Sequence, residues 1–333
     1  MDRTYGEEVA ALGDSWRAWE QWRAVAEVGD LTARLGGPAA FVASGGSLAV
    51  AHLAASVYER RWRQPAAVLT PVDFALSSVA YHTVFVISDS MSHPDALLAA
   101  ARAGEVSACS VVLSNQSADA LRERVDEKVT VVTCPRPGRD GWIATNSILS
   151  LSLGALTVLG ADDGAPDPAD ILERWLAGGR LRPSADLGRN HVLGLYTPGL
   201  RNVAVDLETR VMEAGLGSVT ITDLRNLGHG RHVGLYRNAR STSVLILAER
   251  RWAPVVQRTV ETLPPGVESV IWQAGADDEW APVELLVPSI GFLASRAAEA
   301  GADPGNPSVW SGGNELFRAR VVDLVPGLTE EIR

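Results

Sequence analysis

Lysine is almost missing from this sequence: Lys128 is the only one among 333 residues, and it follows Asp126 and Glu127 directly before a strand-like run. Catalysis through a Schiff base needs a desolvated lysine beside the carbonyl group of the substrate. A charged loop does not give a lysine that environment. The composition therefore argues against Schiff-base chemistry.

Cysteine and long apolar runs are scarce as well. The two cysteines, Cys109 and Cys134, lie in apolar, strand-like surroundings without CxxC or Cys/His spacing, which predicts buried, reduced thiols in a cytoplasmic protein. No apolar run approaches the ~20 residues that span a bilayer. We therefore expect a soluble, cytoplasmic protein with no membrane partner, no metal and no other cofactor.

Clustered positive charge is the third absence. The formal net charge is −10, and the arginines are scattered along the chain. A protein that binds nucleic acid neutralises phosphates with a basic face, so we expect no nucleic-acid partner. A small anionic substrate needs only a few local donors and is not excluded.

What the sequence has is a regular alternation of strand-like and helix-like segments. The apolar, strand-like runs are residues 39–43, 66–70, 83–87, 107–113 and 129–133, and then 192–196, 218–222, 243–247 and 268–272. Helical patterns separate them, including residues 48–62, 143–159, 203–214, 254–262 and 283–300. This alternation predicts an α/β fold of two doubly wound units, each a mainly parallel sheet flanked by helices.

The chain divides by composition into four parts. Residues 1–35 form an N-terminal helical segment, in which Trp16, Trp19 and Trp22 have the spacing of a packing or subunit-contact face rather than of a ligand site. Residues 36–165 form the first α/β unit and residues 166–190 a linker. Residues 191–333 form the second unit with a C-terminal strap, which we expect to end in a strand over residues 319–324.

Two serine-rich turns follow strands of the first unit. The first turn is Ser44, Gly45, Gly46 and Ser47, and the second holds Ser88, Ser90, Ser92 and His93. Ligands of parallel α/β sheets bind beyond the carboxyl ends of strands, where helix N-termini offer free N–H groups to phosphate. The turns therefore indicate a phosphate cradle, or else the serines are only N-caps of helices.

A carboxylate and a histidine sixteen residues apart mark the second unit. Glu213 ends a helical segment after one strand, and His229 lies in a glycine-rich loop after the next. In an α/β domain this order can bring both to one end of the sheet, where a carboxylate can move a carbon-bound proton and an imidazole can open a sugar ring. The alternative is a solvated glutamate and a loop histidine without a shared site. Arg210, one turn before Glu213, either orients that carboxylate and stabilises an enediolate or forms a surface ion pair.

Together these motifs resemble the double SIS (sugar isomerase) domain family, which includes the isomerase half of glucosamine-6-phosphate synthase and the fructosamine-6-phosphate deglycases. The similarity covers about residues 36–330: residues 44–47 resemble the CGTS turn, 88–90 the first serines of the SQSGxT loop, and 141–146 the GVASTK stretch. Asp206, Arg210 and Glu213 fall where the ALEGALKLKE helix has a glutamate, a lysine and the catalytic glutamate. His229 falls at the histidine of the ELKHGP motif, with the family's spacing.

The resemblance implies roles for these residues. Ser47, Ser88 and Ser90 would bind the phosphate of a sugar, and Thr145 and Asp206 would join the substrate-binding set. Glu213 would carry the proton between C1 and C2, and His229 would act on the ring oxygen, across a dimer interface as in the family. The resemblance thus implies a homodimer or a higher homo-oligomer.

The chain departs from the family pattern at several positions. Met91 stands in place of a glycine, and we expect its bulk to crowd a phosphate, so that the ligand is shifted, smaller or not phosphorylated. His93 replaces a threonine and is either a phosphate donor or an exposed cap. Asn146 replaces a lysine, and Arg231 follows Gly230 where the family has proline, which adds a group that can bind an anion.

The function that these patterns favour is an enzyme that acts on a small phosphosugar or aminosugar. The reaction is aldose–ketose isomerisation or the deglycation of a sugar–amine adduct, because both begin with ring opening and a proton transfer between C1 and C2. The alternative is a non-catalytic regulator that binds a phosphosugar, which the loss of the family's lysine and of two phosphate-loop residues would predict.

Overall fold

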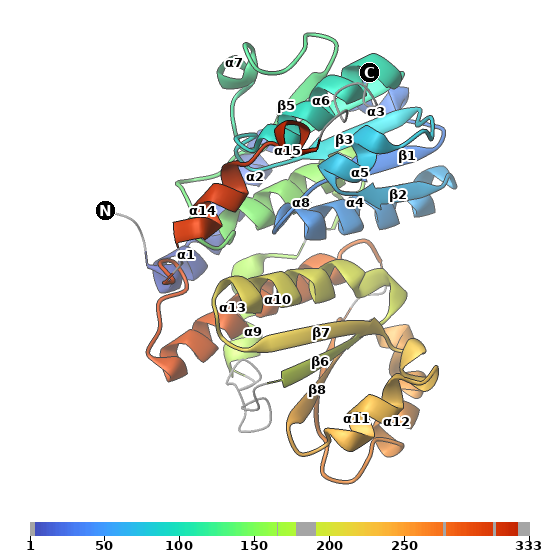
Figure 1. The fold of residues 1–333 in the computed structure, drawn as a ribbon, viewed down its shortest axis with the longest axis vertical. Helices are drawn as coiled ribbons and strands as arrows, with labels where there is room; N and C mark the ends of the chain where they lie inside the picture. Colours follow the sequence, from blue (N-terminus) through green and yellow to red (C-terminus); the bar gives the residue numbers. More distant parts are fainter. Residues whose placement is uncertain (1–3, 165, 178–190, 276–277, 309–310, 326–333) are drawn as a thin grey trace. The chain divides into compact units, whose positions relative to one another are not determined.

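The computed structural model describes residues 4–164, 166–177, 191–275, 278–308 and 311–325. The chain divides into two compact units (Figure 1). The first unit contains residues 17–138 and 150–163 and the residues described from 308 onward, and the second contains the described residues up to 16, 139–149 and those from 164 to 307. Each unit is built on its own parallel sheet, so the predicted fold class is confirmed.

The first unit holds a five-stranded sheet with the order β2-β1-β3-β4-β5. Its strands are β1 (Ala39–Val42), β2 (Ala66–Leu69), β3 (Thr83–Ile87), β4 (Cys109–Ser114) and β5 (Thr130–Thr133), all paired in parallel. Its helices include α3 (Gly29–Arg34), α4 (Ser47–Trp62), α5 (Pro71–Leu76), α6 (Pro94–Val106), α7 (Ala118–Leu121), α14 (Ser311–Arg318) and α15 (Val321–Leu324). The residues of helices α2 (Leu12–Arg23) and α8 (Asn146–Val158) are divided between the two units.

Alternation of side chains along the strands explains why helices cover both faces of this sheet. Ala40 and Val42 of β1 pack with the buried alanines of α6, whose small side chains let the helix lie close to the sheet. Phe41, on the opposite face, packs against Phe85 of β3 and Tyr58 of α4, with ring centroids 5.1 and 5.7 Å away. A strand that is buried on both faces reads as a continuous apolar run, as the sequence of β1 does.

The second unit holds a four-stranded parallel sheet with the order β7-β6-β8-β9. Its strands are β6 (His191–Tyr196), β7 (Ser218–Asp223), β8 (Thr242–Ala248) and β9 (Glu268–Gln273). Its helices are α1 (Tyr5–Ala10), α9 (Pro168–Ala177), α10 (Arg201–Glu213), α11 (Arg231–Arg237), α12 (Ala253–Glu261) and α13 (Ala281–Ala300), with short 3₁₀ turns η2 (Pro198–Leu200), η3 (Asn226–Gly228) and η4 (Arg250–Trp252). Helices α10 and α13 cover one face of this sheet, and α11 and α12 cover the other (Figure 1).

The two ends of the chain differ in part from the sequence prediction. The N-terminal helical segment is three helices, α1, α2 and α3, and its Trp16 and Trp19 are buried as packing residues. The predicted strand at residues 319–324 is wrong: helix α15 lies there, because Val321 and Val322 pack on Ala75 and Leu98 instead of pairing with a strand. The described part of the predicted linker is mostly helix α9, and residues 178–190 lie outside the described residues.

Among the described residues, no helix is long and apolar enough to cross a membrane.

Candidate active site

Both serine turns lie at the carboxyl ends of neighbouring strands in the first unit. Ser44 and Gly45 follow β1 and are exposed, and Ser88 follows β3. The chain continues from β1 outward to β2 and then returns to place β3 on the other side of β1. Such a reversal of strand order is where open α/β sheets bind ligands. The fold thus brings together, within one unit, the two turns that the sequence singled out.

The second turn is held by hydrogen bonds within itself. The Ser88 hydroxyl accepts a bond of 3.1 Å from the backbone N–H of Met91, and the Ser90 hydroxyl accepts one of 3.3 Å from the N–H of Ser92. The hydroxyls of Ser90 and Ser92 lie 2.7 Å apart. These bonds fix the direction of each serine side chain before any ligand is present.

Met91 does not crowd this turn, so that expectation is wrong. Its backbone has a φ of 48°, in the left-handed region, and its side chain is 0% exposed among Val84, Phe74 and Ala96. The strained backbone costs about 1–2 kcal/mol, and burial of the side chain returns about 1.5–3 kcal/mol. Methionine is therefore tolerated at a left-handed position because its side chain enters the core.

His93 forms the N-cap of α6. Its Nδ1 accepts a hydrogen bond of 3.2 Å from the backbone N–H of Asp95, and its ring meets the ring of Phe317 edge-on at 4.9 Å. Of the two roles that the sequence left open, the structure shows the cap.

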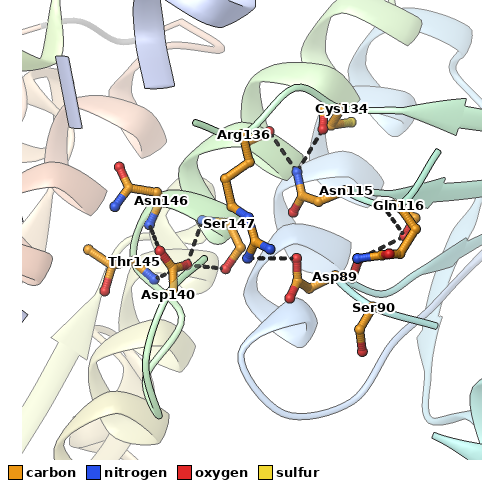
Figure 2. A network of polar contacts seen from close by, with 12 residues as sticks. Asp89, Ser90, Asn115, Gln116, Cys134, Arg136, Asp140, Thr145, Asn146 and Ser147 are labelled. Atoms are coloured by element: carbon orange, nitrogen blue, oxygen red, sulfur yellow. Dashed lines mark hydrogen bonds and ion pairs between the residues drawn. The ribbon is translucent and has the colours of Figure 1, made fainter. Parts of the chain in front are cut away.

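Sequence reasoning missed three polar residues at the same edge of the sheet (Figure 2). The guanidinium of Arg136, after β5, lies 3.0 Å from the carboxylate of Asp89. Asn115, after β4, donates to the carbonyl of Cys134 and to the hydroxyl of Ser150, both at 2.9 Å. The available signal was similar for all three, because each lies within three residues after the end of a parallel strand.

The stretch that resembles GVASTK, residues 141–146, leads into the start of α8 in the second unit. The Asp140 carboxylate accepts from the backbone N–H groups of Thr145, Asn146 and Ser147 at 2.9, 3.1 and 2.8 Å (Figure 2). Thr145 is buried and its hydroxyl donates to the carbonyl of Ile143. An aspartate side chain therefore occupies the positive end of this helix.

Arg210 is a buried residue of α10 and not part of a surface ion pair. Its guanidinium makes two bonds to Asp206, of 2.6 and 3.1 Å, and both side chains are 2% exposed. It also donates to the Tyr5 hydroxyl at 3.0 Å and to the carbonyl of Ala144 at 2.8 Å, and Ser289 donates to Asp206 at 2.8 Å. Burial alone would lower the pKa of Arg210, but the charges and hydrogen bonds of Asp206 and Tyr5 together outweigh burial and raise that pKa.

Glu213 is the last residue of α10 and is partly buried. Loss of hydration raises the pKa of its carboxyl group to about 7, against a smaller lowering by the charge of Arg210. A general base works best when its pKa lies near the working pH. Glu213 is thus poised both to accept and to return a proton near neutrality.

His229 is exposed and lies after β7, between η3 and α11. Together with Arg225, His232 and Tyr236 it lines a cavity of about 700 Å³. Arg231, also exposed, begins α11 and lines a separate cavity of about 510 Å³. Gly230 between them has a φ of 96°, which a side chain would disfavour.

Within one chain Glu213 and His229 do not lie at the same end of the sheet, which corrects the sequence prediction. A helix that joins two parallel strands runs back along the sheet, so Glu213 ends α10 just before the start of β7 at Ser218. His229 follows the end of β7 at Asp223. The six residues of β7 separate the two ends by about 17 Å. A shared site therefore requires two chains.

The second sheet also reverses its strand order, between β6 and β8, but its own side chains fill that point. Glu249 is 1% exposed, accepts a 2.9 Å bond from the Thr197 hydroxyl and pairs with Arg251 at 2.8 Å. A Cβ on Gly199 would lie 2.5 Å from the Glu249 carboxylate. Sequence reasoning missed this cluster, since a glutamate at the end of a strand does not reveal that it folds inward.

Two parallel sheets of this kind, each flanked by helices, define the fold of the double sugar isomerase (SIS) proteins, and the chain has this fold. The C-terminal domain of glucosamine-fructose-6-phosphate aminotransferase from Francisella tularensis matches with a TM-score of 0.70 and 13% identity, over 91% of this chain and 98% of that chain. Tagatose-6-phosphate ketose/aldose isomerase from Escherichia coli matches with a TM-score of 0.70 and 14% identity, over 92% and 95%. Glucosamine-6-phosphate deaminase from Thermotoga maritima matches with a TM-score of 0.65 and 16% identity, over 90% and 97%. No protein-family model and no curated protein sequence matches the chain.

Proposed function

We propose that this protein is a sugar isomerase or deglycase in which Glu213 carries a proton between C1 and C2 of an open-chain sugar. The observation that supports this most is the partly buried Glu213 carboxyl group, whose pKa is raised to about 7. Similarity of fold to a ketose/aldose isomerase and to an aminotransferase isomerase-type domain is consistent with it.

The reaction begins with removal of the proton on the carbon next to the carbonyl. The Glu213 carboxylate accepts this proton, and the electron pair of the C–H bond forms the C1–C2 double bond of an enediolate. The protonated carboxyl then returns its proton to C1, while the proton of the C2 hydroxyl passes to the oxygen on C1, which leaves the carbonyl at C2. In a deglycase the substrate carries an amine on C1 of a ketose, and transfer of a proton from C1 to C2 gives an imine at C1. Water adds to this imine, and the C–N bond then breaks to release the amine and an aldose.

Ring opening precedes this step and is assigned to His229 of a second chain. The imidazole would protonate the ring oxygen while a base takes the proton of the anomeric hydroxyl. The two residues lie at opposite ends of β7 in one chain, so a cytoplasmic homodimer or a higher homo-oligomer would have to complete the site. The ligand is a small phosphosugar or aminosugar, and the turns at Ser44–Ser47 and Ser88–Ser92 of the first unit are its candidate binding elements.

Hydrogen exchange tests the proposal directly. Incubation of the full chain with glucose 6-phosphate, fructose 6-phosphate, glucosamine or glucosamine 6-phosphate in D₂O should place deuterium at C1 or C2, as followed by NMR. Glu213→Gln should abolish the exchange. Glu208→Gln is the matched control, because Glu208 lies on the same helix and burial also raises its pKa. Equal exchange in wild type and Glu213→Gln would contradict the proposal.

A regulator that binds the sugar without converting it is the second candidate, and the internally bonded turn at Ser88–Ser92 favours it. Ligands would then raise the unfolding temperature of the wild type while no deuterium enters the sugar. The same experiment therefore separates the two functions.

A further inference from the structure

A cavity of about 430 Å³ in the second unit has no part in the reaction proposed for Glu213. Three segments of that unit form its wall: Thr4, which is the N-cap of α1, residues 139–142 before α8, and residues 303–306 after α13. The volume lies in the range of cavities that hold small molecules. The second unit therefore has a further candidate site, although its own strand-order reversal is filled by side chains.

Hydrogen bonds hold the wall of this cavity in place. The N–H of Trp142 donates to the Gly305 carbonyl at 3.0 Å, and the N–H of Gly141 donates to the Glu8 carboxylate at 2.6 Å. A Cβ on Gly141 would lie 2.8 Å from the Gly305 carbonyl oxygen, so the two loops approach this closely only with glycine there. The Asp140 carboxylate, bonded to the start of α8, also fixes the first loop (Figure 2). The cavity is thus shaped before any ligand arrives.

Three side chains of the wall have no partner within the chain. Over the ranges that the structure describes, the side chains of Arg139, Trp142 and Asn306 make no hydrogen bond, ion pair or ring contact. Trp142 is 49% exposed, although an indole is among the largest apolar surfaces that a side chain can bury. An exposed indole beside a free guanidinium and a free amide suits a ligand that has both an apolar face and polar groups.

We propose that this cavity binds the closed ring of a sugar, with one face of the pyranose stacked on Trp142. The C–H groups of a pyranose give the ring an apolar face, which packs on the flat, electron-rich face of an indole. Sugar hydroxyls both donate and accept hydrogen bonds. Arg139 only donates, the Asp303 carboxylate only accepts, and the Asn306 amide does both. This mixed set matches several hydroxyl groups better than it matches a single charge.

The inference goes beyond the proposed function, because a closed ring has no free carbonyl on which Glu213 could act. Methyl glycosides make use of this difference. The methyl group locks the sugar in its ring form, so a methyl glycoside can occupy the cavity but cannot enter isomerisation.

Calorimetric titration of the full chain tests the site with the methyl pyranosides of glucose, galactose, mannose and N-acetylglucosamine. Sorbitol is the control ligand, since it carries hydroxyl groups but has no ring to stack. We expect at least one glycoside to bind about tenfold more tightly than sorbitol. Equal binding of sorbitol and the glycosides would overturn the inference, and so would the absence of binding by all four glycosides.

Variants of the wall locate the binding. Trp142→Ala should weaken glycoside binding about tenfold, while Trp142→Phe should preserve most of it because a flat ring remains. Asn306→Ala should weaken it about fivefold. Tyr236→Ala is the control, since Tyr236 is an exposed aromatic side chain of the same unit, 68% exposed, and lines a different cavity. Unchanged affinity in Trp142→Ala, with an unfolding temperature like that of the wild type, would overturn the inference.

The hydrogen-exchange experiment keeps the ring site separate from the proposed function. Glu213→Gln should lose exchange and still bind the glycoside as the wild type does. Glycoside binding that depends on Trp142, without exchange in any sugar, would support the ring site and contradict the reaction at Glu213. Exchange that depends on Glu213, without binding of any glycoside, would support the reaction and overturn the ring site.

Discussion

The two sheets reverse their strand order at corresponding points, and these points are filled in opposite ways. Between β1 and β3 the chain places small residues, with Ser44 and Gly45 exposed. Between β6 and β8 it places Glu249, buried and bonded to Thr197 and Arg251. Equal topology thus gives a candidate binding edge in one unit and a closed one in the other. Glu213, the proposed proton carrier of the second unit, lies at the other end of its sheet.

The ion pairs of the two units also differ in how far solvent reaches them. Asp206 and Arg210 are both 2% exposed, whereas Asp89 of the first unit is 36% exposed beside Arg136. A buried pair cannot lose one member without leaving an uncompensated charge. A partly solvated pair can, because water replaces the missing partner.

The largest expected effect comes from breaking the buried pair. Arg210→Ala should lower the free energy of unfolding by about 3–5 kcal/mol, because Asp206 stays buried without its partner. Arg136→Ala should lower it by about 1 kcal/mol or less. Chemical denaturation of both variants gives the comparison. Similar losses in the two variants would show that burial does not change what each ion pair contributes to stability.

The second comparison concerns the glycines at the two reversal points. Gly199→Ala should destabilise the protein by about 2–3 kcal/mol, since the added Cβ would lie 2.5 Å from the Glu249 carboxylate. Gly45→Ala should cost about 1 kcal/mol, because its φ is 54° but nothing lies within 4 Å of the added carbon. Thermal unfolding measures both. A larger loss of stability in Gly45→Ala than in Gly199→Ala would contradict the conclusion that side chains fill the strand-order reversal of the second sheet but not that of the first.

The last effect is a dependence of stability on pH at Glu213. Its folded-state pKa is raised from 4.5 to about 7, so between these values the folded state binds more protons than the unfolded state. The contribution of Glu213 to stability is therefore fully present below pH ~4.5 and is lost as the pH rises toward 7. Glu213→Gln should flatten this part of the stability profile, as urea titrations at several pH values would show. In the exchange reaction the sign is opposite, because only the ionised carboxylate can accept a proton.

The sequence was sufficient for the fold because the inner strands β1, β3, β4 and β8 are buried on both faces. Apolar runs such as that of β8 are then long enough to be recognised, and the order of helices between them implies a parallel sheet. The prediction failed at α15, where Val321 and Val322 are β-branched but find helices to pack on. Local preference for a strand could not outweigh the absence of a neighbouring strand.

The sequence identified the residues of the candidate site better than their geometry. The spacing of Glu213 and His229 was visible, but the direction in which α10 returns across the sheet places them at opposite ends of β7. Met91 appeared to be an obstacle because its residue type is large, while its side-chain direction depends on a left-handed backbone. Asp89 and Arg136 were missed because the residues are 47 positions apart and only the sheet brings them together.

One feature of the second unit bears on how the chain acquires its structure during synthesis. The hydroxyl of Tyr5 donates to the carbonyl of Ile290, 285 positions later, at 3.2 Å. Helix α1 is synthesised long before α13, yet its docking place exists only after α13 has emerged. Helix α1 must therefore remain undocked until α13 has been translated, and Arg210, which donates to the Tyr5 hydroxyl, is enclosed only then.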